Sequence, residues 1–535
     1  TLLAAIIASC AMVLSLTACT SDNKTVVDGQ TTVTSNSAGG VAVFTPSDGI
    51  TLNQQTPLNK WAKLVPDLAK ALADAGFKKG DIDHTTSDSL AKQSRAIQDF
   101  VVDHLSNNTT DDSGIAIAPD NMTLLVAPVV EADASTRQYG DYISQNLSTN
   151  DATDGEATSD GESSEDDSSK DDSSNTESDS TASDEQAQAV DRLVSSLKLA
   201  KESGMHVVLL GNSIEGYKPD AFVKFSDAQT IGKLQAEKMV YKLKLDKASK
   251  DNPKYIEVLL PYTAVDEKGN ANDSTFAQEA FRGIWQVLGS YYQKGVVESP
   301  SGTLDGKSTE NDWQAVAYDA AKEGSTAKVL DKRLAKTDGQ STLTRIDGII
   351  TMNDYIASEV VKELDDLGYT GSAADINPQI TISGIVGNIT GKKDLSRDAV
   401  PDPIKSPEND NANDSSSSDD DADEDTSASD KDRDSQWPLV TGYGAYVSNI
   451  PSIVNGKQWM TGMEDRQTIA TDIAQACAKL NKDEALNSMP SIRNSEVGGV
   501  KKIPTISEPL LAVSASNLKS ALIDPGYISL ADAGL

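Results

Sequence analysis

The feature of this sequence that most constrains its fold is a repeated alternation of short apolar runs with longer amphipathic stretches. Runs such as 41–44 and 207–210 have the length and the β-branched content of buried strands. Between such runs, apolar residues recur at three- and four-residue spacing, which is typical of helices with one buried face. The pattern predicts an α/β fold, in which parallel sheets are covered by helices on both faces. Because 535 residues exceed the size of one ordinary core, we expect more than one such unit.

The first predicted unit begins with a strand at 41–44. One helical face follows it, with Pro66 inside the pattern, so we expect a kink or a later helix start. The residues of this face are Trp61, Leu64, Val65, Leu68 and Leu72. Further strands are predicted at 115–118 and 207–210, with helical spacing over 190–197 between them.

A second series of strands and helices begins near Asp227. The apolar patterns predict a strand at 255–260, an amphipathic helix over 276–288, and a strand at 346–351 that leads into a helix. Asn353 stands at the start of that helix, where an asparagine side chain can accept a hydrogen bond from a free backbone N–H. Two later strands are predicted, at 380–383 and at 438–441.

Two acidic tracts interrupt these units. Residues 151–188 hold fourteen Asp or Glu against one Lys, and residues 408–434 hold twelve against two basic residues, so the tracts carry 23 of the 35 surplus negative charges. Both tracts are nearly free of aliphatic side chains, and we therefore expect disordered insertions at 151–188 and 391–436. A cation-binding role is the alternative, although neither tract has the spacing of a calcium-binding loop. The chain has no basic stripe, which argues against a nucleic-acid partner.

The N-terminal residues are predicted to be a targeting signal rather than part of the fold. Residues 2–16 are almost wholly apolar but too short to span a bilayer comfortably, and they lead into Leu16-Thr17-Ala18-Cys19. Small residues before a cysteine match the bacterial lipobox, in which the cysteine is acylated. We expect a signal peptide at 1–18, lipidation of Cys19, and a tether at 19–39. A plain secretory signal with an incidental cysteine is the alternative. Only Cys477 remains for the folded body, which leaves it no intramolecular disulfide.

Several short motifs, taken in order, resemble those of the type I periplasmic sugar-binding proteins, in particular the xylose-, ribose- and galactose-type solute-binding lipoproteins of ABC transporters. The motifs are FSD at 225–227, IGKLQA at 231–236, IDGI at 346–349 followed by ND at 353–354, NGKQWMT at 455–461, and LIDPGY at 522–527. The resemblance implies two Rossmann-like lobes, a periplasmic binding protein-like type I fold, joined by a hinge that the chain crosses three times. The crossings fall near Asp227, Glu464 and Glu508.

The resemblance also implies the domain boundaries. Lobe one comprises 40–227 with 465–507 and contains the first acidic insertion. Lobe two comprises 228–463 with 508–535 and contains the second. Ligands of such proteins bind between the lobes, and open α/β sheets in general bind ligands at the carboxyl ends of their strands.

The resemblance assigns a set of sugar-contacting residues. In such sites a sugar ring stacks on aromatic faces while polar side chains pair with its hydroxyls, each of which both donates and accepts. Trp61 and Trp313 stand at aromatic positions, Asn353 at the position of a binding asparagine, and Glu464 where a polar side chain closes the site. The remaining members of the set are Lys60, Asn212, Gln278 and Tyr443. The sequence departs from the family at Gly444, where a binding Asp is expected, and at Gln278, where the family has a basic residue.

Three of these residues also have a purely structural interpretation. Trp61 and Trp313 lie on helical faces and suit a hydrophobic core, and Asn353 suits a helix cap. Asn212, Gln278 and Glu464 carry no local signal beyond the resemblance.

The function that follows is capture of a sugar or related polyol by a monomeric, membrane-anchored receptor on the extracytoplasmic face, which delivers it to an ABC permease. No enzymatic activity, metal or cofactor is expected, because the three histidines show no metal-ligand spacing and the sequence holds no nucleophile elbow or convincing carboxylate pair. A sensory sugar receptor that signals to a membrane partner is the alternative, and an exported hydrolase is the third possibility.

Overall fold

The structure of the protein, a computed structural model, describes residues 38–47, 57–107, 117–130, 136–149, 176–265, 271–336, 342–374 and 436–535. It also gives the backbone of a hairpin within the predicted tether, with strands β1 (Lys24–Val27) and β2 (Gln30–Val33). Cys19, most of the two acidic tracts and the strand predicted at 380–383 lie outside the described residues. Across the described part of the chain, no helix is both long and apolar enough to span a membrane.

Lobe one is built on a seven-stranded sheet. Its strand order is β4-β3-β5-β7-β9-β18-β17, and every neighbouring pair is parallel except β17 with β18. The strands are β3 (Gly40–Pro46), β4 (Ile82–Ser87), β5 (Met122–Val126), β7 (His206–Leu210), β9 (Ala221–Lys224), β17 (Ile492–Val497) and β18 (Val500–Ser507). The order reverses beside β3, which is the arrangement of doubly wound α/β sheets.

Helices cover both faces of this sheet, because successive strand residues point to opposite faces. Val41 and Val43 pack in one cluster beneath α1 (Trp61–Asp74) and α12 (Arg466–Leu480). Ala42 and Phe44, on the other face, pack in a second cluster with α2 (Leu90–Asn107) and α3 (Thr176–Glu202). Both faces of the central strands are therefore buried, as their continuous apolar sequences require.

Lobe two is built on a four-stranded parallel sheet of order β12-β10-β14-β15. Its strands are β10 (Lys254–Val258), β12 (Val297–Glu298), β14 (Gly348–Ile350) and β15 (Leu439–Thr441). One face packs against α4 (Ala228–Leu243) and α5 (Thr275–Gln293), and the other against α7 (Ser325–Arg333) and α8 (Asp354–Leu367). Shorter elements include β6 (Asn146–Leu147) and β8 (Ser213–Ile214) in the sequence range of lobe one, and β11 (Leu260–Pro261), β13 (Ala317–Tyr318), α6 (Trp313–Val316) and α11 (Ile450–Val454) in that of lobe two.

Helices α4 and α5 approach each other closely through two glycines. A Cβ on Gly232 would lie 2.2 Å from the carbonyl oxygen of Ala280, and one on Gly283 would lie 2.0 Å from that of Gln229. Neither distance leaves room for a methyl group. The glycines thus set how closely these two helices can pack over the sheet of lobe two.

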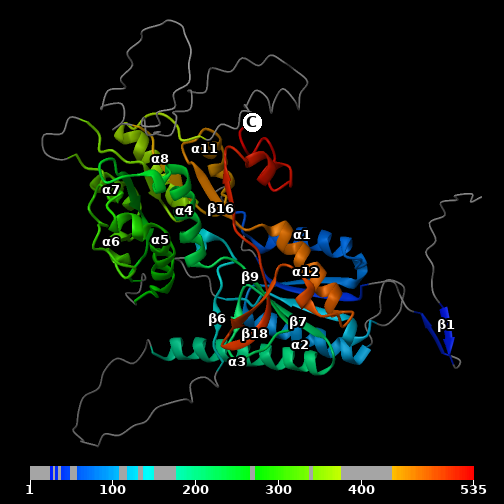
Figure 1. Cartoon of the computed structure of the whole chain (residues 1–535). Helices are drawn as coiled ribbons and strands as arrows, with labels where there is room; N and C mark the ends of the chain where they lie inside the picture. Colours follow the sequence, from blue (N-terminus) through cyan, green and yellow to red (C-terminus); the bar gives the residue numbers. More distant parts are fainter. Residues whose placement is uncertain are drawn as a thin grey trace, which may run out of the picture.

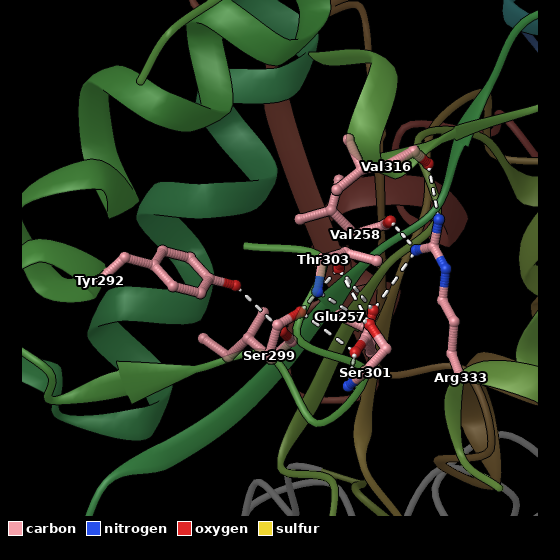
Figure 2. A network of polar contacts seen from close by, with 9 residues as sticks. Glu257, Val258, Tyr292, Ser299, Ser301, Thr303, Val316 and Arg333 are labelled. Atoms are coloured by element: carbon pink, nitrogen blue, oxygen red, sulfur yellow. Dashed lines mark hydrogen bonds and ion pairs between the residues drawn. The ribbon is translucent and has the colours of Figure 1, made fainter. Parts of the chain in front are cut away.

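A buried ion pair between Glu257 and Arg333 lies inside lobe two (Figure 2). Glu257, on β10, accepts hydrogen bonds from the backbone N–H of Ser301 (2.9 Å) and from the hydroxyl of Ser299 (3.1 Å). Its other carboxylate oxygen lies 3.4 Å from the guanidinium of Arg333, which also donates to the carbonyls of Val258 and Val316. Since Glu257 is fully buried, each of these partners offsets the cost of removing its charge from water.

Within the residues that the structure describes, the chain passes between the two lobes three times, and this confirms the predicted fold class (Figure 1). It leaves lobe one after β9 and enters α4, and it returns from β16 (Met460–Met463) to α12. It leaves again after β18 to form β19 (Leu511–Ser514), which pairs antiparallel with β16.

Three details differ from the sequence-based predictions. Residues 117 and 118 are not a strand, because a 3-10 turn begins at Pro119 and the strand is β5, Met122–Val126. Helix α3 begins at Thr176 and so includes the last part of the first acidic tract. Helix α1 begins at Trp61 and continues through Pro66, which lies in its second turn.

Candidate functional site

Polar residues that follow strands of both lobes meet at the junction between the lobes. The hydroxyl and the backbone N–H of Ser226, just after β9, both donate to Oε1 of Glu464, just after β16; the N–H contact is 2.7 Å. The hydroxyl of Tyr443, just after β15, lies 2.6 Å from that of Ser226 and donates to the same Glu464 oxygen at 3.4 Å. Three side chains that follow the strands β9, β15 and β16 thus form one buried cluster.

Burial dominates the protonation of this cluster. Glu464 is 1% exposed, and its burial raises its pKa to about 7 in spite of the hydrogen bonds from Ser226 and Tyr443 that favour the carboxylate. Burial, together with the nearby charge of Glu464, also raises the pKa of Tyr443 well above its usual range. The cluster therefore gains or loses a proton near neutral pH at the glutamate and not at the tyrosine.

Asn353 is a helix cap, as one of the two interpretations of its sequence position predicted. Its side-chain oxygen accepts a hydrogen bond from the backbone N–H of Ile356 at 2.9 Å and so begins helix α8. Its amide nitrogen remains available as a donor and bonds to Oε1 of Gln138, a residue of lobe one, at 3.0 Å. One side chain thus caps a helix of lobe two and contacts lobe one.

Asp354, next to this cap, fixes the loop that follows β15. Its carboxylate accepts hydrogen bonds from Gln458 (2.7 Å), Thr461 (2.9 Å) and the backbone N–H of Tyr446 (2.9 Å). Complete burial raises its pKa to about 6, while these hydrogen bonds act in the opposite direction. Asp354 therefore acts on the junction indirectly, by positioning residues 442–446.

The backbone at this edge is unusual in a way that explains one departure from the family pattern. Gly444 has φ +115°, and Met352 and Ala445 also lie at positive φ, at +68° and +50°. The backbone N–H of Gly444 donates to Gly462 and its carbonyl accepts from Leu58, so the conformation is held from two sides. An aspartate at position 444 would be strained, because side chains disfavour such φ values. The loop is built for glycine rather than for the binding Asp that the resemblance predicts.

Residues 136–145, which we call the bridging segment, lie between the lobes and are anchored to lobe one. Asp141 accepts a hydrogen bond from the backbone N–H of Trp61 (3.1 Å) and forms an ion pair with Lys60 (2.7 Å). The Tyr142 hydroxyl donates to the carbonyl of Lys60 at 2.6 Å, and its ring stacks on Phe225 with centroids 4.6 Å apart. Gly140 makes this path possible, since a Cβ there would lie 2.5 Å from the carbonyl of Asn59.

The opposite side of the bridging segment faces lobe two. The Tyr139 ring lies 4.6 Å from that of Phe276 and 6.2 Å from that of Tyr443, between centroids, and its side chain is 1% exposed. Tyr446 donates from its hydroxyl to the carbonyl of Gln138 at 2.7 Å. Tyr139 and Ile143 belong to the hydrophobic cluster of lobe two, although the segment is anchored on lobe one.

Three of the predicted site residues on lobe one are brought together by this segment. Lys60 and Trp61 hold Asp141, and Asn212 holds Gln145 by accepting from its backbone N–H at 2.9 Å. Trp61 is 2% exposed and packs edge-on against Tyr142 and Phe225, so its ring is a core side chain.

The other predicted residues divide into two groups. Asn353, Tyr443 and Glu464 meet at the junction, since Tyr443 contacts Glu464 and accepts through its carbonyl from the backbone N–H of the residue after Asn353. Gln278 donates to Ser274 within its own helix, and Trp313 packs edge-on against Tyr262. The contacts of these last two residues are thus with neighbouring parts of lobe two.

Residues of the junction that the sequence analysis did not assign to the site include Gln138, Tyr139, Asp141 and Ser226. Ser226 belongs to the FSD motif, in which nothing local singles out the serine side chain. The sequence signal at 136–145 was a pair of tyrosines around a glycine in an otherwise polar stretch. Among the described residues, no group of three or more His, Cys, Asp or Glu side chains could hold a metal ion.

No protein-family model matches the sequence, and no curated protein matches it significantly. Among solved structures, the chain is similar to an ABC transporter solute-binding protein from Clostridium phytofermentans with bound β-D-glucose, at 17% identity over 92% of this chain and 99% of that one, with TM-score 0.44. A carbohydrate transporter solute-binding protein from Chloroflexus aurantiacus in complex with D-glucose is 17% identical over 93% of this chain and 98% of that one, with TM-score 0.44. A periplasmic ribose ABC transporter protein from Conexibacter woesei is 13% identical over 91% of this chain and 96% of that one, with TM-score 0.42. At this level of similarity the matches assign neither a family nor a ligand to the chain.

Proposed function

We propose that this protein is a non-enzymatic solute-binding receptor that captures a sugar or related polyol between its lobes and delivers it to an ABC permease. In this proposal Cys19 is lipidated and anchors the protein at the extracytoplasmic face of the membrane, and the lobes have the boundaries predicted from the sequence. The motif order at 225–236, 346–354 and 455–461 supports it.

The observation that carries the proposal is the meeting of strand ends from both lobes at one junction. Ser226 of lobe one, and Tyr443 and Glu464 beside the second passage of the chain, are linked there by hydrogen bonds. Asn353 adds an amide nitrogen, already aimed at lobe one. Donors and acceptors from both sides of a junction suit a hydroxylated ligand, which stabilises the closed arrangement by touching both lobes.

Isothermal titration against D-glucose, D-galactose, D-xylose and D-ribose tests the proposal. We expect saturable binding of at least one sugar by the full chain. The sharpest variant is Asn353→Asp, which keeps an oxygen to cap helix α8 but removes the amide donor. It should weaken sugar binding about tenfold or more, because a lost hydrogen bond to a buried polar partner is worth about 1–3 kcal/mol.

A matched control is Asp465→Asn, the reverse exchange at the cap of helix α12, which keeps an oxygen to accept from Thr468. It should leave sugar affinity unchanged. Absence of heat from every sugar tested, with a folded protein, would contradict capture of a monosaccharide.

A further inference from the structure

We propose that the bridging segment, residues 136–145, is an internal occupant of the interlobe site, which holds the lobes together without a ligand and which a sugar must displace. The inference rests on the proposed function for the identity of the ligand, but the occupancy itself is argued from contacts. The segment touches lobe one on one side and lobe two on the other, as a trapped ligand would.

The contacts of the segment are of the two kinds that a sugar makes. The amide oxygen of Gln138 accepts from Asn353, the residue whose donor was predicted to bind a hydroxyl. The ring of Tyr139 makes tilted contacts with the rings of Phe276 and Tyr443, at interplanar angles of 52° and 39°, and so covers aromatic surface of lobe two that could pack against the apolar face of a sugar. Gln138 is thus the polar partner of a lobe-two residue, and Tyr139 is the apolar partner of others.

Burial makes the two occupants mutually exclusive. Asn353 is 0% exposed and Tyr443 1% exposed, and Tyr139 itself is 1% exposed. A sugar cannot reach the Asn353 amide or the Tyr443 ring while Gln138 and Tyr139 remain in place. Sugar binding therefore requires the segment to leave lobe two. The apparent affinity for the sugar is the intrinsic affinity multiplied by the fraction of molecules in which the segment has left lobe two.

The segment is also built to stay on lobe one. Asp141 is held by Lys60 and by the backbone of Trp61, and Tyr142 is held by Phe225 and the carbonyl of Lys60. The contacts with lobe two are made by Gln138, Tyr139 and Ile143. Displacement can thus break the contacts to lobe two while those to lobe one persist.

The test compares the full-length protein with its Tyr139→Ala variant by hydrogen–deuterium exchange and by titration with D-glucose, D-galactose, D-xylose and D-ribose. In the variant we expect faster exchange at the amides of 353–356 and 442–446, which lie under the segment, and about tenfold tighter sugar binding. Tyr241→Ala is the matched control, since it removes a tyrosine that is 82% exposed, and it should change neither result.

A second variant, Gln138→Ala, breaks the contact to Asn353 without removing an aromatic side chain from the core, and should shift both measurements in the same direction by less. Unchanged exchange in both folded variants would overturn the proposal. Weaker sugar binding by Tyr139→Ala would also overturn it, since Tyr139 would then be a ligand contact. Faster exchange with no sugar bound by any form would support the occupant and count against the proposed function alone.

Discussion

The hydroxyl of Ser226 donates a hydrogen bond to Oε1 of Glu464, 238 residues further along the chain. Ser226 precedes the first passage between the lobes and Glu464 the second passage. The contact therefore joins two of the three connections between the lobes. A change in the relative orientation of the lobes would therefore act directly on this hydrogen bond.

The protein should become more stable as the pH falls from about 8 to about 5. Burial raises the pKa of Glu464 to about 7 and that of Asp354 to about 6, so the folded state holds protons that the unfolded state releases in this range. Such groups destabilise the fold once ionised, and a rise from 4.5 to about 7 corresponds to about 3 kcal/mol. Glu464→Gln should remove part of this pH dependence in urea unfolding. The exposed change Glu237→Gln should retain all of it, and equal slopes for the two variants would refute the assignment.

Ser226→Ala should lower the free energy of unfolding by about 1–3 kcal/mol at pH 8. The substitution removes a hydroxyl that donates to Glu464 and contacts Tyr443, and leaves a buried carboxylate with fewer donors. Urea denaturation at pH 8 measures the loss. Ser203→Ala serves as the control, because its hydroxyl makes a hydrogen bond at the surface. A loss no larger than that of the control would mean that the junction does not depend on this contact.

Arg333→Met should destabilise lobe two by about 3–5 kcal/mol, because it leaves the carboxylate of Glu257 buried without its cation. The double variant with Glu257→Gln removes that uncompensated charge and should recover part of the loss. Thermal unfolding of the single variant, the double variant and the wild-type protein measures both the loss and the recovery. Equal melting temperatures for the single and double variants would show that the charge of Glu257 is not the cause.

Gly283→Ala should destabilise the protein by about 1–3 kcal/mol, even though alanine favours helices, because its methyl group would meet the carbonyl of Gln229 at 2.0 Å. Ser290→Ala, an exposed change in the same helix α5, isolates the helix-propensity effect and should be neutral or slightly stabilising. Chemical denaturation of both variants gives the comparison. A gain in stability from Gly283→Ala would show that helices α4 and α5 can move apart at low cost.

The parts of the fold that depend on local pattern could be predicted from the sequence. The buried face of α1 follows from its spacing, since Trp61, Leu64, Leu68 and Leu72 are all buried. The cap at Asn353 follows from its residue type and place. The strand predicted at 115–118 was wrong at its described residues, 117 and 118, because a turn begins at Pro119 and the chain enters the sheet only after it, at β5.

The junction could be predicted only in part, since its contacts join distant residues. Asn353, Tyr443 and Glu464 were found through the resemblance, but their partners were not. Gln138 lies 215 residues before Asn353, and nothing in its local sequence indicates that contact. The packing of Trp61 likewise depends on Tyr142 and Phe225, which contact its ring from separate parts of the chain.

The place of β17 and β18 in the seven-stranded sheet has a consequence for biosynthesis. These strands come from 492–507, near the end of the chain, while β3, which lies next to the opposite edge strand of the same sheet, begins at Gly40. A ribosome delivers the N-terminal residues first, so the partly made chain holds an open sheet edge along β9 until its last strands arrive. Contacts between residues so far apart in sequence also slow folding. Until these strands arrive, the unpaired backbone groups of β9 are open to pairing with other chains.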